Sequence, residues 1–124
     1  MINRFLHIEQ KLIDEQKSLC QKYNAEFLGA SLNNFAGVAL ESLKTFQLPV
    51  NGLRHPVENE QSSSWYIWAG EFSRAEDFFQ PVHISHVVDL CPNALKYLGL
   101  APGWRFLFDD FYEDVWFDKD LLNI

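Results

Sequence analysis

The amino-acid sequence predicts an α+β fold with a long N-terminal helix, a mainly antiparallel sheet and a shorter, broken helix. Apolar residues recur at helical spacing near the N-terminus, apolar and polar residues alternate near the C-terminus, and a proline interrupts a helical segment between them. With 124 residues, 48% of them hydrophobic, the chain can bury one core and is too short for two ordinary domains. We therefore expect residues 1–124 to form a single domain.

The N-terminal helix is predicted from pairs of apolar residues that recur every seven positions. These pairs, extended at either end by Ile2 and Tyr23, are Phe5/Leu6, Leu12/Ile13 and Leu19/Cys20. The spacing gives one apolar face, and the polar residues between the pairs, Gln16 among them, are assigned to water. We expect a helix over residues 1–25 that packs on its own domain. Docking of a partner chain, including a second copy in a homodimer, is the alternative.

The region after this helix contains short apolar stretches separated by turn residues. Residues 27–32 and 35–43 lie on either side of Asn33-Asn34, which predicts two strands joined by a turn. Residues 47–64 carry two prolines, Asn51-Gly52 and a polar run, which predicts a long loop without regular structure. The dense aromatic run 65–69 predicts a strand covered on both faces and therefore central in the sheet.

The last 42 residues predict a helical segment followed by a hairpin. Residues 83–98 are expected to be helical, with a break or restart at Pro92 and a stop at Gly99. Residues 103–108 and 112–118 alternate apolar and polar side chains around the turn residues Asp109-Asp110, which predicts an antiparallel pair of strands.

The composition excludes some classes of binding partner and favours one cellular compartment. Ten Lys and Arg against seventeen Asp and Glu leave a net charge of −7, so phosphate backbones and anionic membranes would be repelled on average. No nucleic-acid or membrane partner is therefore expected. Cys20 and Cys91 lie far apart without metal-ligand spacing, and no signal-peptide pattern or apolar run of about 20 residues is present, which favours a cytoplasmic protein with reduced thiols.

The acidic charge is concentrated near the C-terminus. Residues 104–124 contain six Asp and Glu against two basic residues and so hold a charge of −4 out of −7. Acidic groups interleaved with Tyr and Trp combine electrostatic steering with aromatic anchors, whereas a purely solubilising role is the alternative. The residues predicted to bind a partner are Asp109, Asp110, Tyr112, Glu113, Asp114 and Trp116.

A second set of residues combines polar groups with large rings and could line a pocket. Its members are Arg54, His55, Trp65, Trp68, Glu71, His83, His86 and Arg105. Such a pocket would suit a small-molecule-binding protein or a small hydrolytic enzyme. Arg105 requires an acid such as Glu113, or a stacking ring, if its strand is buried. Motifs for a metal site, an activated nucleophile or a phosphate cradle are missing from the sequence, so we expect no metal, no cofactor and no enzymatic activity.

Five motifs together resemble a known family. They are LPVNGLRHP at 48–56, WYIWAGE at 65–71, DFFQPVH at 77–83 with His86 beyond it, YLGLAPGWRFL at 97–107 and YEDVWFD at 112–118. The region 38–124 is similar to the bacterial immunity-protein-like domains of polymorphic toxin systems, a family once catalogued as a domain of unknown function; helix 1–25 lies outside the resemblance. The resemblance implies a small α+β domain that binds and neutralises a cognate protein toxin.

Overall fold

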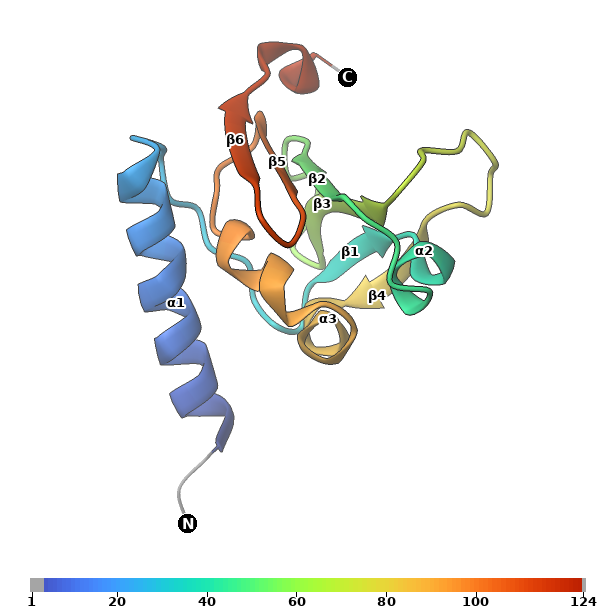
Figure 1. The fold of residues 1–124 in the computed structure, drawn as a ribbon. Helices are drawn as coiled ribbons and strands as arrows, with labels where there is room; N and C mark the ends of the chain where they lie inside the picture. The colour runs from blue at the N-terminus through green and yellow to red at the C-terminus, as the bar shows by residue number, and fades with distance from the viewer. Residues whose placement is uncertain (1–3, 124) are drawn as a thin grey trace.

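The computed structural model describes residues 4–123, and in the first helix it describes side chains from Glu9 onward. Six strands form one sheet in the order β4-β1-β3-β2-β5-β6. Helices and turns of 3-10 helix complete the fold (Figure 1). The elements are α1 (Arg4–Lys22), β1 (Phe35–Val38), α2 (Leu40–Lys44), β2 (Val50–Arg54), β3 (Ser62–Ala69), β4 (Gln80–His83), α3 (Ile84–Leu90), η1 (Pro92–Tyr97), β5 (Trp104–Phe108), β6 (Glu113–Phe117) and η2 (Lys119–Leu122).

The predicted α+β class is confirmed. Four of the five strand pairs are antiparallel, and β1 with β3 is the parallel pair. One face of the sheet carries the core, with α3 and η1 packed against it and η1 lying between α1 and the β5–β6 hairpin (Figure 1). Across residues 4–123, no helix combines the length and the apolar character needed to cross a membrane.

Helix α1 forms as the apolar spacing predicts, and the described part of its apolar face packs on η1 within the same chain. Leu19 and Cys20 are buried. Gln16, expected to face water, is also buried, and its Nε2 donates to the Leu95 carbonyl at 2.9 Å. A glutamine is tolerated in this stripe because it pairs with a backbone oxygen of η1. The Ile2 and Phe5/Leu6 positions of the stripe lie outside the described side chains.

The prediction for residues 27–43 is wrong in two places. Residues 27–32 form no strand; an isolated bridge between Phe27 and Leu100 is their β contact. Residues 35–43 divide into β1 and the short helix α2. The Ala39 amide donates to Ile67 of β3 at 2.9 Å and is followed at once by the helical turn, because the chain must cross the end of the sheet to start β2.

The prediction of an irregular loop over residues 47–64 is also wrong. Strand β2 occupies Val50–Arg54 of this stretch, and β3 begins at Ser62. Because β2 pairs with both β3 and β5, Asn51-Gly52 lies inside a strand and not in a turn. The glycine is required by packing: Gly52 lies opposite Phe106 in β5, and a β-carbon there would overlap the Phe106 ring. Glycine inside a strand commonly marks such a close approach.

The remaining elements agree with the sequence. β3 lies between β1 and β2 with Trp65 fully buried, which confirms its central place. α3 ends at Leu90 and η1 restarts at Pro92, as the proline predicts. β5 and β6 form the expected antiparallel hairpin, in which Phe106 and Val115 face the core.

Arg54, at the end of β2, has 1% of its surface exposed. Its guanidinium donates to the carbonyls of Ser63 at 3.0 Å and Leu100 at 2.7 Å, and to that of Leu28. Burial lowers the pKa of Arg54 to about 10. The three hydrogen bonds offset part of this desolvation and hold two connecting segments, at Leu28 and at Leu100, against the end of the sheet beside Ser63 of β3.

Gly52→Ala is expected to destabilise the fold by about 1–3 kcal/mol, because Phe106 is stacked on Tyr97 at 4.6 Å and cannot withdraw from the new methyl group. Urea unfolding followed by tryptophan fluorescence measures this loss. Asn51→Ala, on the adjacent and less buried position, is the control and should change stability by less than about 1 kcal/mol. Equal effects of the two substitutions would contradict this account of Gly52.

Candidate functional site

Three connections leave the sheet at one end. Val50, the first residue of β2, pairs with Phe108 at the end of β5 and with Ala69 at the end of β3. The segment that leads into β2, the loop after β3 and the β5–β6 turn therefore emerge together. This end of the molecule gathers side chains from parts of the chain that lie far apart in the sequence.

The β5–β6 turn is held in shape by its own backbone and by Asp109. The Asp109 amide donates to the Tyr112 carbonyl at 3.0 Å. One carboxylate oxygen of Asp109 accepts hydrogen bonds at 2.8 Å from the amides of both Phe111 and Tyr112. An aspartate that accepts from amides two and three residues ahead is a standard way to fix a tight turn. Asp109 therefore acts mainly on the conformation of the turn.

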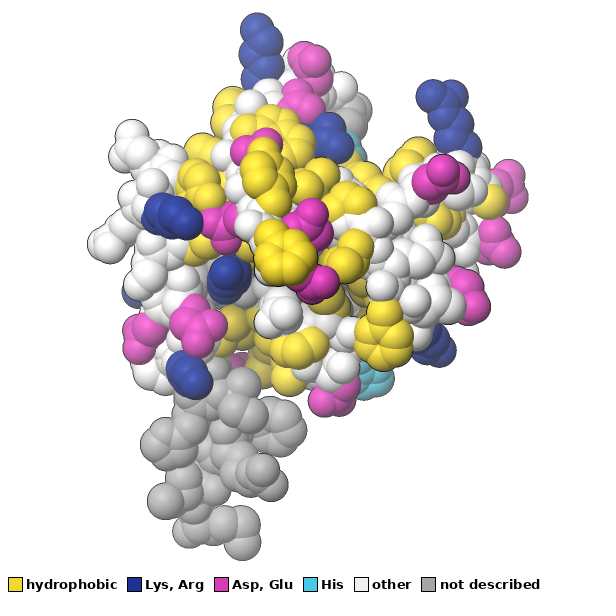
Figure 2. Space-filling view, viewed as in Figure 1, with side chains coloured by type: hydrophobic (Ala, Val, Ile, Leu, Met, Phe, Trp, Pro, Cys, Tyr) yellow, Lys and Arg dark blue, Asp and Glu magenta, His cyan; other side chains and the backbone are white. Residues whose placement is uncertain are grey.

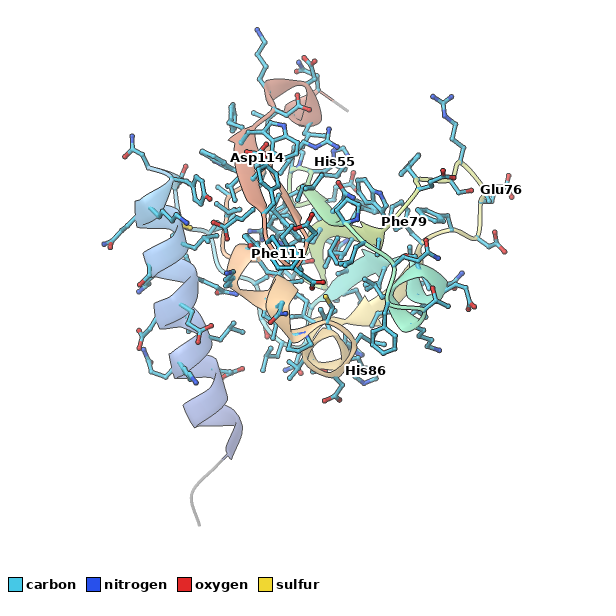
Figure 3. All side chains as sticks on the ribbon, in the orientation of Figure 1. His55, Glu76, Phe79, His86, Phe111 and Asp114 are labelled. Atoms are coloured by element: carbon cyan, nitrogen blue, oxygen red, sulfur yellow. The ribbon has the colours of Figure 1, made fainter. Side chains whose placement is uncertain are left out.

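The side chains beyond Asp109 project into solvent. Phe111 is 98% exposed and Tyr112 is 57% exposed. Asp110 is exposed, and within the described residues its carboxylate makes neither a hydrogen bond nor an ion pair. Figure 2 shows a ring at the front of the molecule with carboxylates on both sides, at the place where Figure 3 labels Phe111. A rigid turn thus presents an apolar ring next to a free negative charge.

Hollows lie on both sides of this turn and share Asn93, Phe108, Asp109 and Asp110 as walls. The first, of about 520 Å³, is completed by Phe46 and Leu48 from the segment before β2, together with buried core residues. The second, of about 430 Å³, is completed by the turn residues Phe111 and Tyr112 and by η1. The turn is therefore the ridge between two adjoining hollows.

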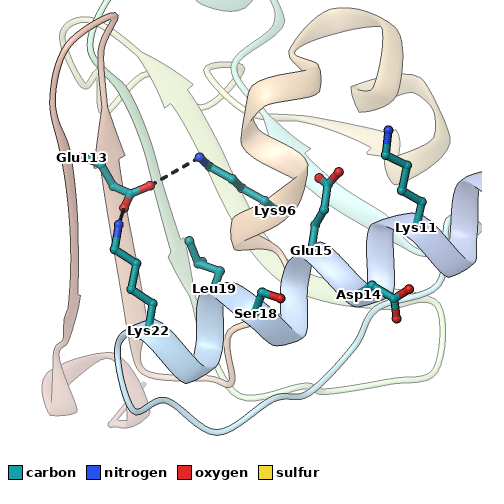
Figure 4. A pocket seen from close by; sticks show the side chains of 8 residues that line it. All are labelled: Lys11, Asp14, Glu15, Ser18, Leu19, Lys22, Lys96 and Glu113. Carbon is teal, nitrogen blue, oxygen red and sulfur yellow. Dashed lines mark hydrogen bonds and ion pairs between the residues drawn. The ribbon is translucent and has the colours of Figure 1, made fainter.

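Glu113, the first residue of β6, has a different environment from the other acids of the hairpin. Its carboxylate accepts hydrogen bonds from the hydroxyls of Tyr23 and Tyr97, and pairs with Lys22 at 2.9 Å and Lys96 at 3.5 Å (Figure 4). Burial acts to raise the pKa of Glu113, but the bonds from Tyr23, Tyr97 and Lys22 outweigh it and bring this pKa to about 2. Glu113 is thus the acid of the predicted set that forms ion pairs within the described part of the chain.

The two tyrosines respond in the opposite sense. Burial, reinforced by the hydrogen bond to the Glu113 carboxylate, raises the pKa of both Tyr23 and Tyr97. Both phenols therefore stay protonated and continue to donate at neutral pH. The cluster joins α1, η1 and the hairpin at one carboxylate.

Asp114 and Trp116 lie on the sheet face that does not carry the core. Asp114 is exposed, and Trp116 pairs across the sheet with Arg105, whose guanidinium lies 5.4 Å from the indole ring. Arg105 also forms an ion pair with Asp118 at 3.2 Å. The expected stacking ring is present, but the acid is Asp118 and not Glu113, because Glu113 points to the opposite face.

The residues of the alternative pocket are spread over the molecule. Arg54 and Trp65 lie in the core, and Trp68 is buried beneath Phe72 and Phe79 of the loop after β3. Other members are placed separately: His55 Nδ1 lies 3.0 Å from the Leu121 carbonyl, Glu71 is exposed and Arg105 pairs with Asp118.

Two pairs in this set lie together: the Arg54 guanidinium lies 5.6 Å from the Trp65 ring in the core, and His83 lies beside His86. The two histidines are the pair that lines a hollow. Their rings lie 6.0 Å apart and line a hollow of about 560 Å³ with Phe35, on which His83 stacks. Among the residues that the structure describes, no group of three or more His, Cys, Asp or Glu side chains is arranged to hold a metal ion.

Sequence reasoning missed two exposed rings that line the hollows beside the β5–β6 turn, Phe111 and Phe46. Phe111 lies inside a turn composed otherwise of polar residues and tyrosine, and an apolar ring in such a place is itself a signal of exposure. Phe46 carried no comparable signal, because its exposure depends on where α2 ends.

Comparison with known proteins adds one match. A model of the Imm33-like domain family matches residues 15–118, from the middle of α1 to the residue after β6. Searches of curated proteins and of solved structures returned no match.

Glu113→Gln is expected to lower the free energy of unfolding near pH 7 by about 1–3 kcal/mol, because it removes the charge that four donors surround. The pKa of Glu113 in the folded chain, about 2, is below that of an unfolded glutamate, so its stabilising contribution is complete above about pH 5 and is lost as the pH falls towards 2. The difference between the two proteins should therefore shrink over that range.

Urea unfolding at several pH values measures this difference. Asp114→Asn, which removes an exposed neighbouring charge, is the matched control and should have a small effect at every pH. A pH-independent loss in Glu113→Gln would show that the carboxylate cluster does not stabilise the fold in this way.

Proposed function

The chain belongs to the Imm33-like domain family, and from this membership and the surface at the β5–β6 turn we propose that it is a non-enzymatic immunity protein that binds and neutralises a cognate protein toxin. Binding takes place in the cytoplasm of the cell that the toxin would damage. The contact surface comprises Asp109, Asp110, Phe111 and Tyr112 at the turn, with Asp114 and Trp116 on the adjoining sheet face.

The single observation that carries this proposal is the exposed ring of Phe111 beside the free carboxylate of Asp110, on a turn fixed by Asp109. Aromatic anchors surrounded by polar groups dominate the binding energy of many interfaces. A preorganised turn also lowers the entropy cost of association. Acidic charge at the surface accelerates encounter with a basic partner, and the net charge of −7 has the appropriate sign.

The placement of the polar residues also supports a binding protein over an enzyme with a polar pocket. Arg54 bonds to backbone carbonyls, and Arg105 pairs with Asp118. Both guanidinium groups therefore have partners within the fold, although the buried Nε of Arg105 has no hydrogen-bond partner among the described residues. His55 lies apart from the His83 and His86 pair.

Affinity capture from native cells, followed by identification and purification of the captured protein, tests the proposal. We expect the captured protein to arrest growth when expressed alone and to be harmless when this chain is co-expressed. Capture of no protein whose toxicity the chain suppresses would refute the proposal.

The double substitution Asp110→Lys with Phe111→Ala is expected to weaken binding of the captured toxin by about 100-fold or more, since it reverses the free charge and removes the exposed ring. Calorimetry or surface plasmon resonance gives the affinity. Asp120→Lys, an equivalent charge reversal in exposed η2, should leave the affinity within about threefold of the original. Unchanged unfolding midpoints establish that both variants are folded.

A further inference from the structure

Phe46 occupies a backbone position that suits glycine better than phenylalanine. It follows α2 with a φ of +55°, in the left-handed region. Its amide donates to the Leu43 carbonyl at 3.1 Å, and the next amide, of Gln47, donates to the Ser42 carbonyl at 3.2 Å. These two bonds form the Schellman arrangement that ends many helices, in which the left-handed residue is usually glycine because a β-carbon is unfavourable there.

The Phe46 ring receives little compensation from packing, since 84% of the residue is exposed. A bulky residue that is unfavourable in its backbone position and unburied contributes little to the stability of the isolated chain. Leu48, two residues later, is also exposed, at 47%. Two apolar side chains, Phe46 and Leu48, are therefore exposed to solvent beside the β5–β6 turn.

These side chains form one wall of the 520 Å³ hollow, and the acids of the turn form the other. The walls include Asp109 and Asp110 but neither Lys nor Arg among the described residues, and the floor includes the core residues Leu43, Val50 and Phe108. The groove is thus apolar at its base and negatively charged at its rim. The Asp110 carboxylate, which has no partner within the described part of the chain, lies where this groove meets the second hollow.

We propose, resting on the function proposed above, that this groove receives a basic, apolar segment of the partner protein. An Arg or Lys side chain of that segment pairs with Asp110, and a neighbouring apolar side chain packs between Phe46 and Leu48. Charge complementarity identifies the occupant: an unneutralised acidic rim attracts a cation, and aromatic rings such as Phe46 and Phe111 favour the flat face of a guanidinium in particular. In this account Phe46 is a binding residue, and its role in binding explains why a bulky side chain occupies an unfavourable left-handed backbone position.

A defined peptide pair tests the occupant without the toxin. The probes are acetyl-Leu-Arg-Trp-Leu-amide and its charge-swapped partner, acetyl-Leu-Glu-Trp-Leu-amide, titrated into the isotope-labelled full chain. We expect the arginine peptide to shift the backbone amide resonances of Phe46, Asn93 and Asp110 saturably, and to bind at least tenfold more tightly than the glutamate peptide. Equal binding of the two peptides, or shifts confined to another surface, would overturn the proposal.

Two variants separate binding from folding. Phe46→Gly should raise the unfolding temperature, since glycine suits the left-handed position, and should weaken binding of the arginine peptide at least tenfold. Asp110→Asn should weaken it similarly with little change in stability. Leu122→Ala and Asp120→Asn, at exposed positions of η2, are the matched controls and should bind as the original protein does. Unaltered binding in both groove variants would overturn the assignment.

The outcomes also distinguish this inference from the proposed function. If Phe46→Gly and Asp110→Asn neutralise the captured toxin as well as the original protein does, the immunity function stands and the groove assignment fails. If the arginine peptide binds the groove but no toxin is captured, the groove assignment stands and the immunity function fails. Concentration-dependent shifts of the same amides without peptide would identify a second copy as the occupant and overturn the assignment.

Discussion

The Glu113 carboxylate is the interaction on which the position of the hairpin depends. It brings together α1, η1 and β6 through Lys22, Tyr23, Lys96 and Tyr97, of which Lys22 lies 91 positions from Glu113 in the sequence. The sheet alone would hold β6 by one neighbour, because β6 is an edge strand. Because the Glu113 carboxylate also bonds to residues of α1 and η1, the turn that follows β5 is held by both the sheet and the helical layer. A binding surface at this turn inherits that rigidity.

The acidic C-terminal region therefore contains carboxylates with separate tasks. Asp109 fixes the turn, Glu113 joins the layers, and Asp118 pairs with Arg105 and accepts a hydrogen bond from the Asp120 amide in the first turn of η2. Asp110 has no such task within the described residues. The acids of the C-terminal region, which the sequence does not tell apart, are thus divided by their contacts into structural acids and a smaller number that are free to bind a partner.

The local sequence pattern was sufficient to predict some of the helices and strands and insufficient to predict others. The helix, the hairpin and the break at Pro92 follow from spacing and backbone chemistry, which act over a few residues. Gln16 and Gly52 were misread because their reasons lie elsewhere in the chain: one bonds to Leu95, and the other makes room for Phe106. The site divides in the same way. The acidic turn is visible in the sequence, whereas Phe46 joins it only because β2 starts beside the end of β5.

The hydrogen bonds of Asp109 also bear on how such a protein can diversify. They run to backbone amides, so the shape of the turn depends little on which side chains stand at positions 110 and 111. Under the proposed function, mutations at these two positions can change which partner is bound while the turn and the core keep their structure. During evolution, substitutions at positions 110 and 111 could therefore change the binding specificity with little loss of stability, provided that Asp109 is kept.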